Sequence, residues 1–196
     1  MKRIARWILK LMGWTIDKET PKGINKAVIV VGPHTSNWDF IVGRLAFYTY
    51  GMPVKILIKK EAFVPPLGWL LKAIGGIPVD RKSKNNLTEQ AAAVFGQFDS
   101  VYMVFTPEGT RTYNPNWKKG FYYIALKANV PIYIAYMDFE RKIGGFMEPL
   151  VPSGDIDKDI AYIKEKLSAY KGKYPEHGIR HPKDDDYSIV KSKKKK

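Results

Sequence analysis

The chain has 196 residues, of which 45% are hydrophobic, enough for one domain with a core built around a sheet. It contains no cysteine, which excludes disulfides, a thiolate nucleophile and a cysteine-ligated metal, and its three histidines are too few and too scattered for a zinc site. The excess of 33 basic over 19 acidic residues predicts a polyanionic partner: a nucleic acid, an anionic membrane or a phosphorylated substrate.

The first predicted element is an amphipathic helix within residues 1–20. Apolar residues recur at helical spacing, with basic residues on the other side: Ile4, Trp7, Ile8, Leu11 and Met12. Such a helix can lie in a membrane interface or dock on the protein's own core, and the sequence leaves both open. No apolar stretch approaches the roughly 18 to 20 residues that span a bilayer, and the start does not resemble a signal peptide. A cytoplasmic location is therefore the default expectation.

Strands and helices alternate through the rest of the chain. Strands are expected at 27–31, 54–59, 101–105 and 130–137, and helices at 37–50, 87–98, 122–129 and 156–170. Prolines and glycines interrupt the apolar residues 63–77, which predicts an irregular, partly helical wall. The alternation predicts an α/β fold, a single domain with a mostly parallel central sheet flanked by helices.

The most informative polar segment, His-Thr-Ser-Asn-Trp-Asp at residues 34–39, follows the strand predicted at 27–31. Open α/β sheets hold their ligands at this end of their strands. One interpretation is structural, because Ser36 and Asp39 fit a capping box at the start of the next helix. The other pairs His34 with Asp39, which requires His34 to precede the helix, since residues five apart on a helix lie about 140° apart. Both interpretations can hold together.

Two further segments present arginines after turns. Residues 107–111, Pro-Glu-Gly-Thr-Arg, follow the strand predicted at 101–105, and residues 75–81, Gly-Gly-Ile-Pro-Val-Asp-Arg, end in Arg81. A guanidinium fork beside hydroxyl and backbone donors suits a phosphate group. The structural alternatives are a Glu108 to Arg111 ion pair that closes a loop and a solvated Arg81 at a strand end.

The order of these three segments resembles the glycerolipid acyltransferases, the family that includes lysophosphatidic acid acyltransferase and glycerol-3-phosphate acyltransferase. The matching patterns are His-x4-Asp, Gly-x-Ile-x-Val-Asp-Arg and Pro-Glu-Gly-Thr-Arg, and residues 130–132, Val-Pro-Ile, look like a fourth motif. The resemblance spans about residues 27 to 137. Thr106 and Pro78 stand where the family often has an aromatic residue, and Ala135 stands where a second proline is frequent, which leaves the acceptor and the acyl length open.

The resemblance implies that His34 takes the proton of an acceptor hydroxyl while Asp39 holds its imidazole in the right tautomer. The hydroxyl of a lysophospholipid or glycerol phosphate then attacks an acyl-CoA or acyl carrier protein thioester directly. Residues implied to bind the phosphate and glycerol of the acceptor are Arg81, Glu108, Gly109, Thr110 and Arg111. Independently of the resemblance, the apolar residues 63–77 are expected either to line a groove for the acyl chain or to belong simply to the core. No metal and no cofactor besides the thioester co-substrate are implied.

These inferences divide the chain into a membrane-interface helix at 1–20, an acyltransferase domain at 21–183 and a charged tail at 184–196 that is expected to be disordered. The enzyme would be peripheral on the inner face of an anionic membrane, with no nucleic-acid partner. The alternatives are a thioesterase in which the same pair activates water, a basic nucleic-acid-binding module, and a lipid carrier without turnover. The arginine-bearing loops argue against the thioesterase, because water needs no phosphate-binding group.

Overall fold

The computed structural model describes residues 1–18, 23–80 and 87–185. Its α-helices are α1 (Lys2–Leu11), α2 (Trp38–Tyr50), α3 (Leu67–Ala73), α4 (Leu87–Gly96), α5 (Gly120–Ala128) and α6 (Ile156–Ser168). Its strands are β1 (Thr15–Ile16), β2 (Lys26–Gly32), β3 (Val54–Lys59), β4 (Gly76–Val79), β5 (Val101–Phe105), β6 (Ile132–Asp138) and β7 (Ile143–Phe146). Short 3-10 turns are η1 (Lys60–Ala62), η2 (Pro175–His177) and η3 (Pro182–Asp184).

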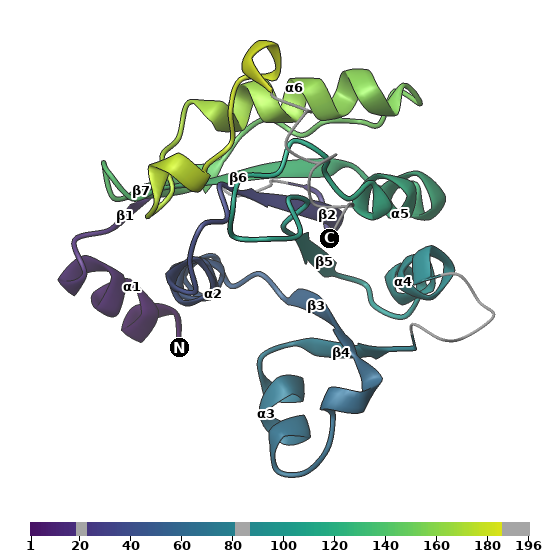
Figure 1. The fold of residues 1–196 in the computed structure, drawn as a ribbon. Helices are drawn as coiled ribbons and strands as arrows, with labels where there is room; N and C mark the ends of the chain where they lie inside the picture. Colours follow the sequence, from purple (N-terminus) through teal and green to yellow (C-terminus); the bar gives the residue numbers. More distant parts are fainter. Residues whose placement is uncertain (19–22, 81–86, 186–196) are drawn as a thin grey trace, which may run out of the picture.

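The strands form one sheet in the order β1-β7-β6-β2-β5-β3-β4. β2 pairs in parallel with β6 on one side and β5 on the other, and β3 pairs in parallel with β5 and β4. β7 runs antiparallel to β6. The predicted α/β fold with a mostly parallel sheet is therefore confirmed, and the helices cover both faces of that sheet (Figure 1).

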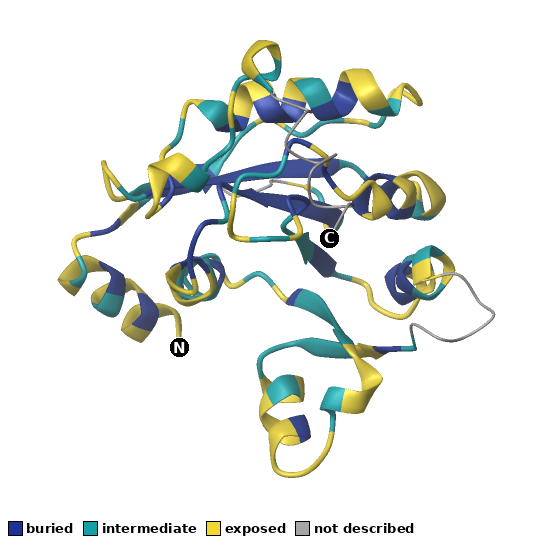
Figure 2. Ribbon diagram, viewed as in Figure 1, coloured by how far each residue is buried: buried dark blue, intermediate teal, exposed yellow. Residues whose placement is uncertain are grey.

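The central strand β2 explains why the sheet is covered on both sides. Val28 and Val30 belong to the core formed with α4, α5 and α6, whereas Ala27, Ile29 and Val31 belong to the core formed with α1 and α2. Successive side chains of a strand point to opposite faces, so an unbroken apolar run needs two apolar layers around it. Burial of each valine or isoleucine contributes about 1.5–3 kcal/mol. β2 and its neighbour β6 are accordingly buried along almost their whole length (Figure 2).

The N-terminal helix α1 docks on α2 through one side and exposes the other. Ala5 and Leu9 are buried, while Ile4, Trp7 and Leu11 are 64%, 61% and 67% exposed. The helix therefore docks on the protein's own core, and it also presents apolar side chains outward. Within the described ranges, no helix is long and apolar enough to cross a bilayer.

Candidate active site

Two loops meet where β2 and β5 end, because these strands are parallel neighbours. The loop after β2 carries His34, and α2 begins at Trp38, so His34 precedes the helix as its pairing with Asp39 requires. His34 Nδ1 lies 2.9 Å from Asp39 Oδ2. The structure therefore brings the two residues of the first motif together in a direct hydrogen bond.

Three further hydrogen bonds hold the Asp39 carboxylate. The backbone N–H groups of Thr35 and Ser36 donate to Oδ2 at 2.7 and 2.8 Å, and the Ser36 hydroxyl donates to Oδ1 at 2.8 Å. Ser36 was expected to cap α2, but the N-cap is Asn37, and Ser36 instead accepts the Trp38 N–H at 3.2 Å. The loop therefore wraps around the carboxylate that follows it.

These contacts fix the ionisation state of Asp39. Burial by itself would raise the pKa of Asp39, but hydrogen bonds from His34, Ser36 and Thr35 outweigh burial and hold the pKa below its ordinary value. Asp39 is therefore an anion at neutral pH. The Asp39 carboxylate can only accept a hydrogen bond from His34 Nδ1. A neutral His34 ring therefore carries its hydrogen on Nδ1, and the lone pair of Nε2 stays available.

Glu108, from the loop after β5, contacts the backbone of His34. Its Oε1 accepts the His34 N–H at 2.9 Å, and its buried Oε2 has no hydrogen-bond partner among the described residues. Burial raises the pKa of Glu108 to about 8, and the nearby Asp39 anion adds to the effect. The carboxyl group is thus uncharged at neutral pH. It supports the loop of His34 and is not among the residues that line the cavity described below.

After Glu108, the loop that follows β5 runs along the surface of the protein. Gly109 has φ +66°, a conformation that favours glycine, and the stem of Lys118 packs on it. The Lys118 N–H closes the loop by donating to the Pro107 carbonyl at 2.7 Å. Thr110 is half-buried with its hydroxyl 3.1 Å from that of Thr112, and Arg111 is exposed. The sequence analysis did not single out Lys118, a basic residue that contacts this loop at Pro107 and Gly109.

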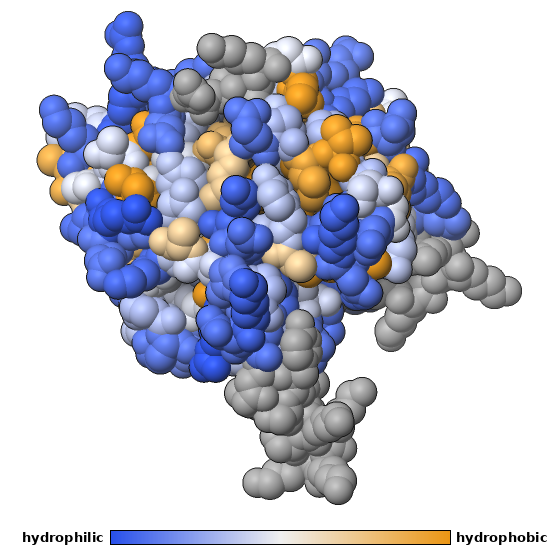
Figure 3. Space-filling model, turned by 90° about the horizontal axis from the view of Figure 1, so that it is seen from above, coloured by the Kyte–Doolittle hydropathy of each residue, from blue (hydrophilic) through white to orange (hydrophobic). Residues whose placement is uncertain are grey.

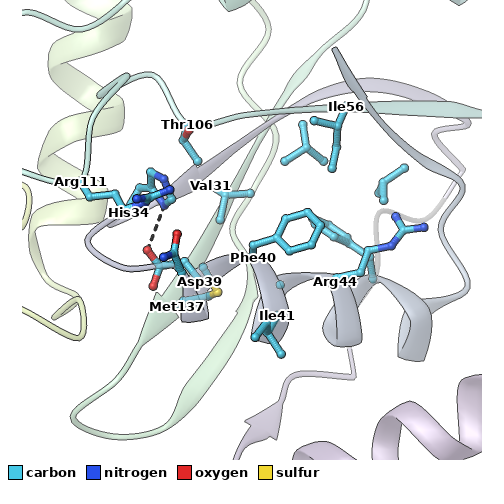
Figure 4. A pocket seen from close by; sticks show the side chains of 15 residues that line it. Val31, His34, Asp39, Phe40, Ile41, Arg44, Ile56, Thr106, Arg111 and Met137 are labelled. Atoms are coloured by element: carbon cyan, nitrogen blue, oxygen red, sulfur yellow. Dashed lines mark hydrogen bonds and ion pairs between the residues drawn. The ribbon is translucent and has the colours of Figure 1, made fainter. Parts of the chain in front are cut away.

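A cavity of about 540 Å³ opens beside His34 and Asp39. Arg111 lies next to His34 at one end of it, and Arg44 and Ile56 lie at the other, beyond Phe40 (Figure 4). Its apolar lining comes from α2, the central strands and β3: Val31, Phe40, Ile41, Phe47, Val54, Ile56, Val104 and Met137. The site therefore joins a polar end, with His34, Asp39 and Arg111, to a mainly apolar end that also holds the Arg44 guanidinium.

The remaining expectations from the sequence concern residues 63–77, Arg81 and metal binding. Residues 63–77, which were expected to line a groove for the acyl chain, are not among the residues that line this cavity. The apolar residues of α2 do so instead, and their position directly after the first motif is the signal that could have identified them. Arg81 lies outside the described residues. In the ranges that the structure describes, no group of three or more histidine, aspartate or glutamate side chains could hold a metal ion.

Comparison with known proteins shows which family the chain resembles. Residues 12–137 match the family model described as Acyltransferase. Among solved structures, the 1-acyl-sn-glycerophosphate (LPA) acyltransferase PlsC from Thermotoga maritima is similar, with a TM-score of 0.61 and 18% sequence identity over 86% of this chain and 75% of that chain. No curated protein matches significantly. Because the family model covers more than half of the chain, the protein belongs to the acyltransferase family, and it shares the fold of the Thermotoga maritima acyltransferase.

Proposed function

We propose that this acyltransferase moves a fatty acyl group from an acyl-CoA or acyl carrier protein thioester to a hydroxyl of a lysophospholipid or glycerol phosphate. The observation that carries the proposal is the composition of one cavity. The His34–Asp39 pair, the Arg111 guanidinium and the apolar side chains of α2 and the neighbouring strands all line the same cavity. An acyl transfer to a phosphorylated alcohol needs a base, an anion-binding group and room for a hydrocarbon chain.

His34 acts as the general base in this proposal. Its Nε2 takes the proton from the acceptor hydroxyl as the oxygen attacks the thioester carbonyl, and Asp39 stabilises the imidazolium that results. The tetrahedral intermediate collapses with loss of the thiolate, which receives the proton from His34, so no acyl-enzyme forms. A positioned base of this kind contributes typically about 10² to 10⁴ in rate.

The two ends of the cavity bind different parts of the substrates. Arg111, beside His34, pairs with the phosphate of the acceptor, because a guanidinium fork matches phosphate oxygens in geometry and charge. The apolar end takes the acyl chain, with a gain of about 0.8 kcal/mol for each methylene that leaves water. Lysophosphatidic acid is the acceptor we favour, since the structurally similar Thermotoga maritima protein acts as a 1-acyl-sn-glycerophosphate acyltransferase.

The protein would meet these lipids at an anionic membrane surface. Exposed apolar side chains gather on α1 and around α3, namely Ile4, Trp7, Leu11, Val64, Leu67, Trp69 and Leu70. Both helices lie on the lower side of the molecule in Figure 1, opposite α6, and the net charge is +14. The face over α6 is mostly hydrophilic, with small separate apolar patches (Figure 3). Apolar anchors and basic residues together favour an anionic bilayer.

The test is product identification by mass spectrometry. The purified protein is incubated with acyl-CoA or acyl carrier protein thioesters, with and without lysophosphatidic acid or glycerol 3-phosphate. We expect an acylated acceptor, and little free fatty acid when the acceptor is absent. Release of fatty acid at the same rate without acceptor would identify a thioesterase, and failure to consume any thioester would leave a binding module.

A further inference from the structure

The segment at residues 172–185 follows the part of the chain that matches the family model, which ends at residue 137. It nevertheless contacts both loops of the site. The Tyr174 N–H donates to the Thr35 hydroxyl at 3.2 Å, next to His34 in the chain. Gly172 lies so close to Thr35 that a Cβ there would come within 2.5 Å of its side chain. Absence of a side chain at residue 172 therefore permits the contact.

The other end of the segment contacts the loop after β5 through Asp185. The Tyr113 hydroxyl donates to Asp185 Oδ1 at 3.0 Å. Lys164 of α6 forms an ion pair with Asp185 Oδ2 and donates to the Pro115 carbonyl at 2.7 Å. The side chains of Lys164 and Asp185 are only 4% and 2% exposed. The sequence assigned Asp184 and Asp185 to a tail expected to be disordered; in the structure Asp184 ends η3 and the Asp185 side chain is buried in the folded body.

Hydrogen bonds continue from this ion pair to the catalytic loop. Asn114, between Tyr113 and Pro115, donates to the Glu108 carbonyl oxygen at 2.8 Å. Glu108 in turn accepts the His34 N–H through its side chain. The Arg180 guanidinium also lies over the Tyr113 ring, 4.0 Å from its centroid. The loop that carries Arg111 is therefore held at Tyr113 and Pro115 by groups from α6 and the C-terminal segment.

We propose that Asp185, together with Lys164, is a positioning residue that holds the loop of residues 107–118 so that Arg111 lies next to His34 at the polar end of the cavity. The proposal rests on the function proposed above in taking Arg111 as a ligand of the acceptor phosphate. A buried ion pair is costly to break on one side alone, because one charge then stays buried without its partner. It also fixes the direction of the groups it bonds, here the Tyr113 side chain and the Pro115 carbonyl.

The test removes both charges together in Lys164→Met/Asp185→Leu. We expect the KM for lysophosphatidic acid to rise about tenfold, while the KM for the acyl thioester stays within about twofold, since its chain binds against α2 and β3. A structural role alone would lower the active fraction, so kcat would fall and both KM values would stay the same. Tyr113→Phe keeps both charges, removes one hydrogen bond and should shift the acceptor KM in the same direction by less.

A matched control is Asp157→Asn, which breaks the exposed Lys119–Asp157 pair near the same loop and should change neither KM. Amide hydrogen exchange gives a readout that does not need turnover. In the double variant, and more weakly in Tyr113→Phe, exchange should accelerate at residues 107–118 and stay unchanged in β2 and β5. Unchanged exchange at 107–118 would overturn the proposal. A wild-type protein that does not acylate the acceptor would refute the proposed function instead, and exchange would still decide on Asp185.

Discussion

The two ends of the cavity are built on different principles. At the polar end, His34 lies in the loop after β2, Asp39 lies in the first turn of α2 and Glu108 supports the His34 loop from behind, and hydrogen bonds to backbone and side chains fix their positions. At the apolar end, Phe40, Gly43 and Ile56 lie on α2 and β3, where regular backbone and packing set the shape. The polar end therefore serves the reaction and the other end serves binding of the acyl chain. Substitutions at the polar end should change kcat, and substitutions at the other end should change the preference for acyl length.

The largest effect should come from Asp39→Asn. This change keeps the shape of the side chain but removes the anion that orients and stabilises the His34 ring, so kcat should fall by about 10² or more. Steady-state kinetics with lysophosphatidic acid measures it. The KM for a long-chain thioester, which belongs to the other end of the cavity, should change little. Wild-type kcat in this variant would mean that the anion has no part in the chemistry.

The second effect concerns stability and pH at the polar end. Burial raises the pKa of Glu108 to about 8, so the folded protein binds a proton there that the unfolded chain releases above an ordinary pKa near 4.5. Wild-type stability should therefore decline as pH rises from 5 to 8, relative to Glu108→Gln, by on the order of a few kcal/mol. Urea unfolding at several pH values measures the difference. The stability of the surface variant Glu176→Gln should change with pH in the same way as that of the wild type. If the stability of Glu108→Gln also followed the wild type at every pH, Glu108 would not be uncharged in the folded protein.

A smaller effect is expected at the apolar end from Gly43→Leu. A Cβ at Gly43 would find only Met137 nearby, at 3.8 Å, so the larger side chain would extend into the cavity without a backbone clash. We expect roughly a tenfold loss of kcat/KM for long acyl thioesters, and less for short ones. Gly96→Leu in α4, where a Cβ meets nothing within 4 Å, is the matched control. Equal loss for all chain lengths would place the acyl chain elsewhere.

The smallest effect should lie outside the cavity, on α1. Trp7→Asp replaces an exposed apolar side chain with a charge without touching the side of the helix that Ala5 and Leu9 bury. Partitioning onto anionic vesicles should fall severalfold, while transfer to a short-chain, soluble acceptor stays the same. Leu126→Asp, an exposed residue on α5, serves as the control. If the two variants partition alike, α1 is a structural element only.

The sequence predicted best what depends on continuous apolar runs and short spacings. The residues of β3 and β5 were predicted at their observed bounds, because glycine, proline or polar residues flank each run. β4, which Pro78 interrupts, was expected only as an alternative, the strand end before Arg81; β1, of two residues, and β7, which Gly144 and Gly145 weaken, were missed. His34 and Asp39 are five residues apart, so their pairing could be anticipated. The contact of Glu108 with the His34 backbone spans 74 residues and depends on β2 and β5 being neighbours, which no local pattern encodes.

The most direct measurement compares wild type with His34→Ala in acyl transfer from a labelled thioester to lysophosphatidic acid. Thermal unfolding of both proteins would establish that each is folded. The account predicts phosphatidic acid from the wild type and a rate lower by at least about 10² in the variant. Equal rates of product formation by the two folded proteins would contradict the assignment of the imidazole as the base.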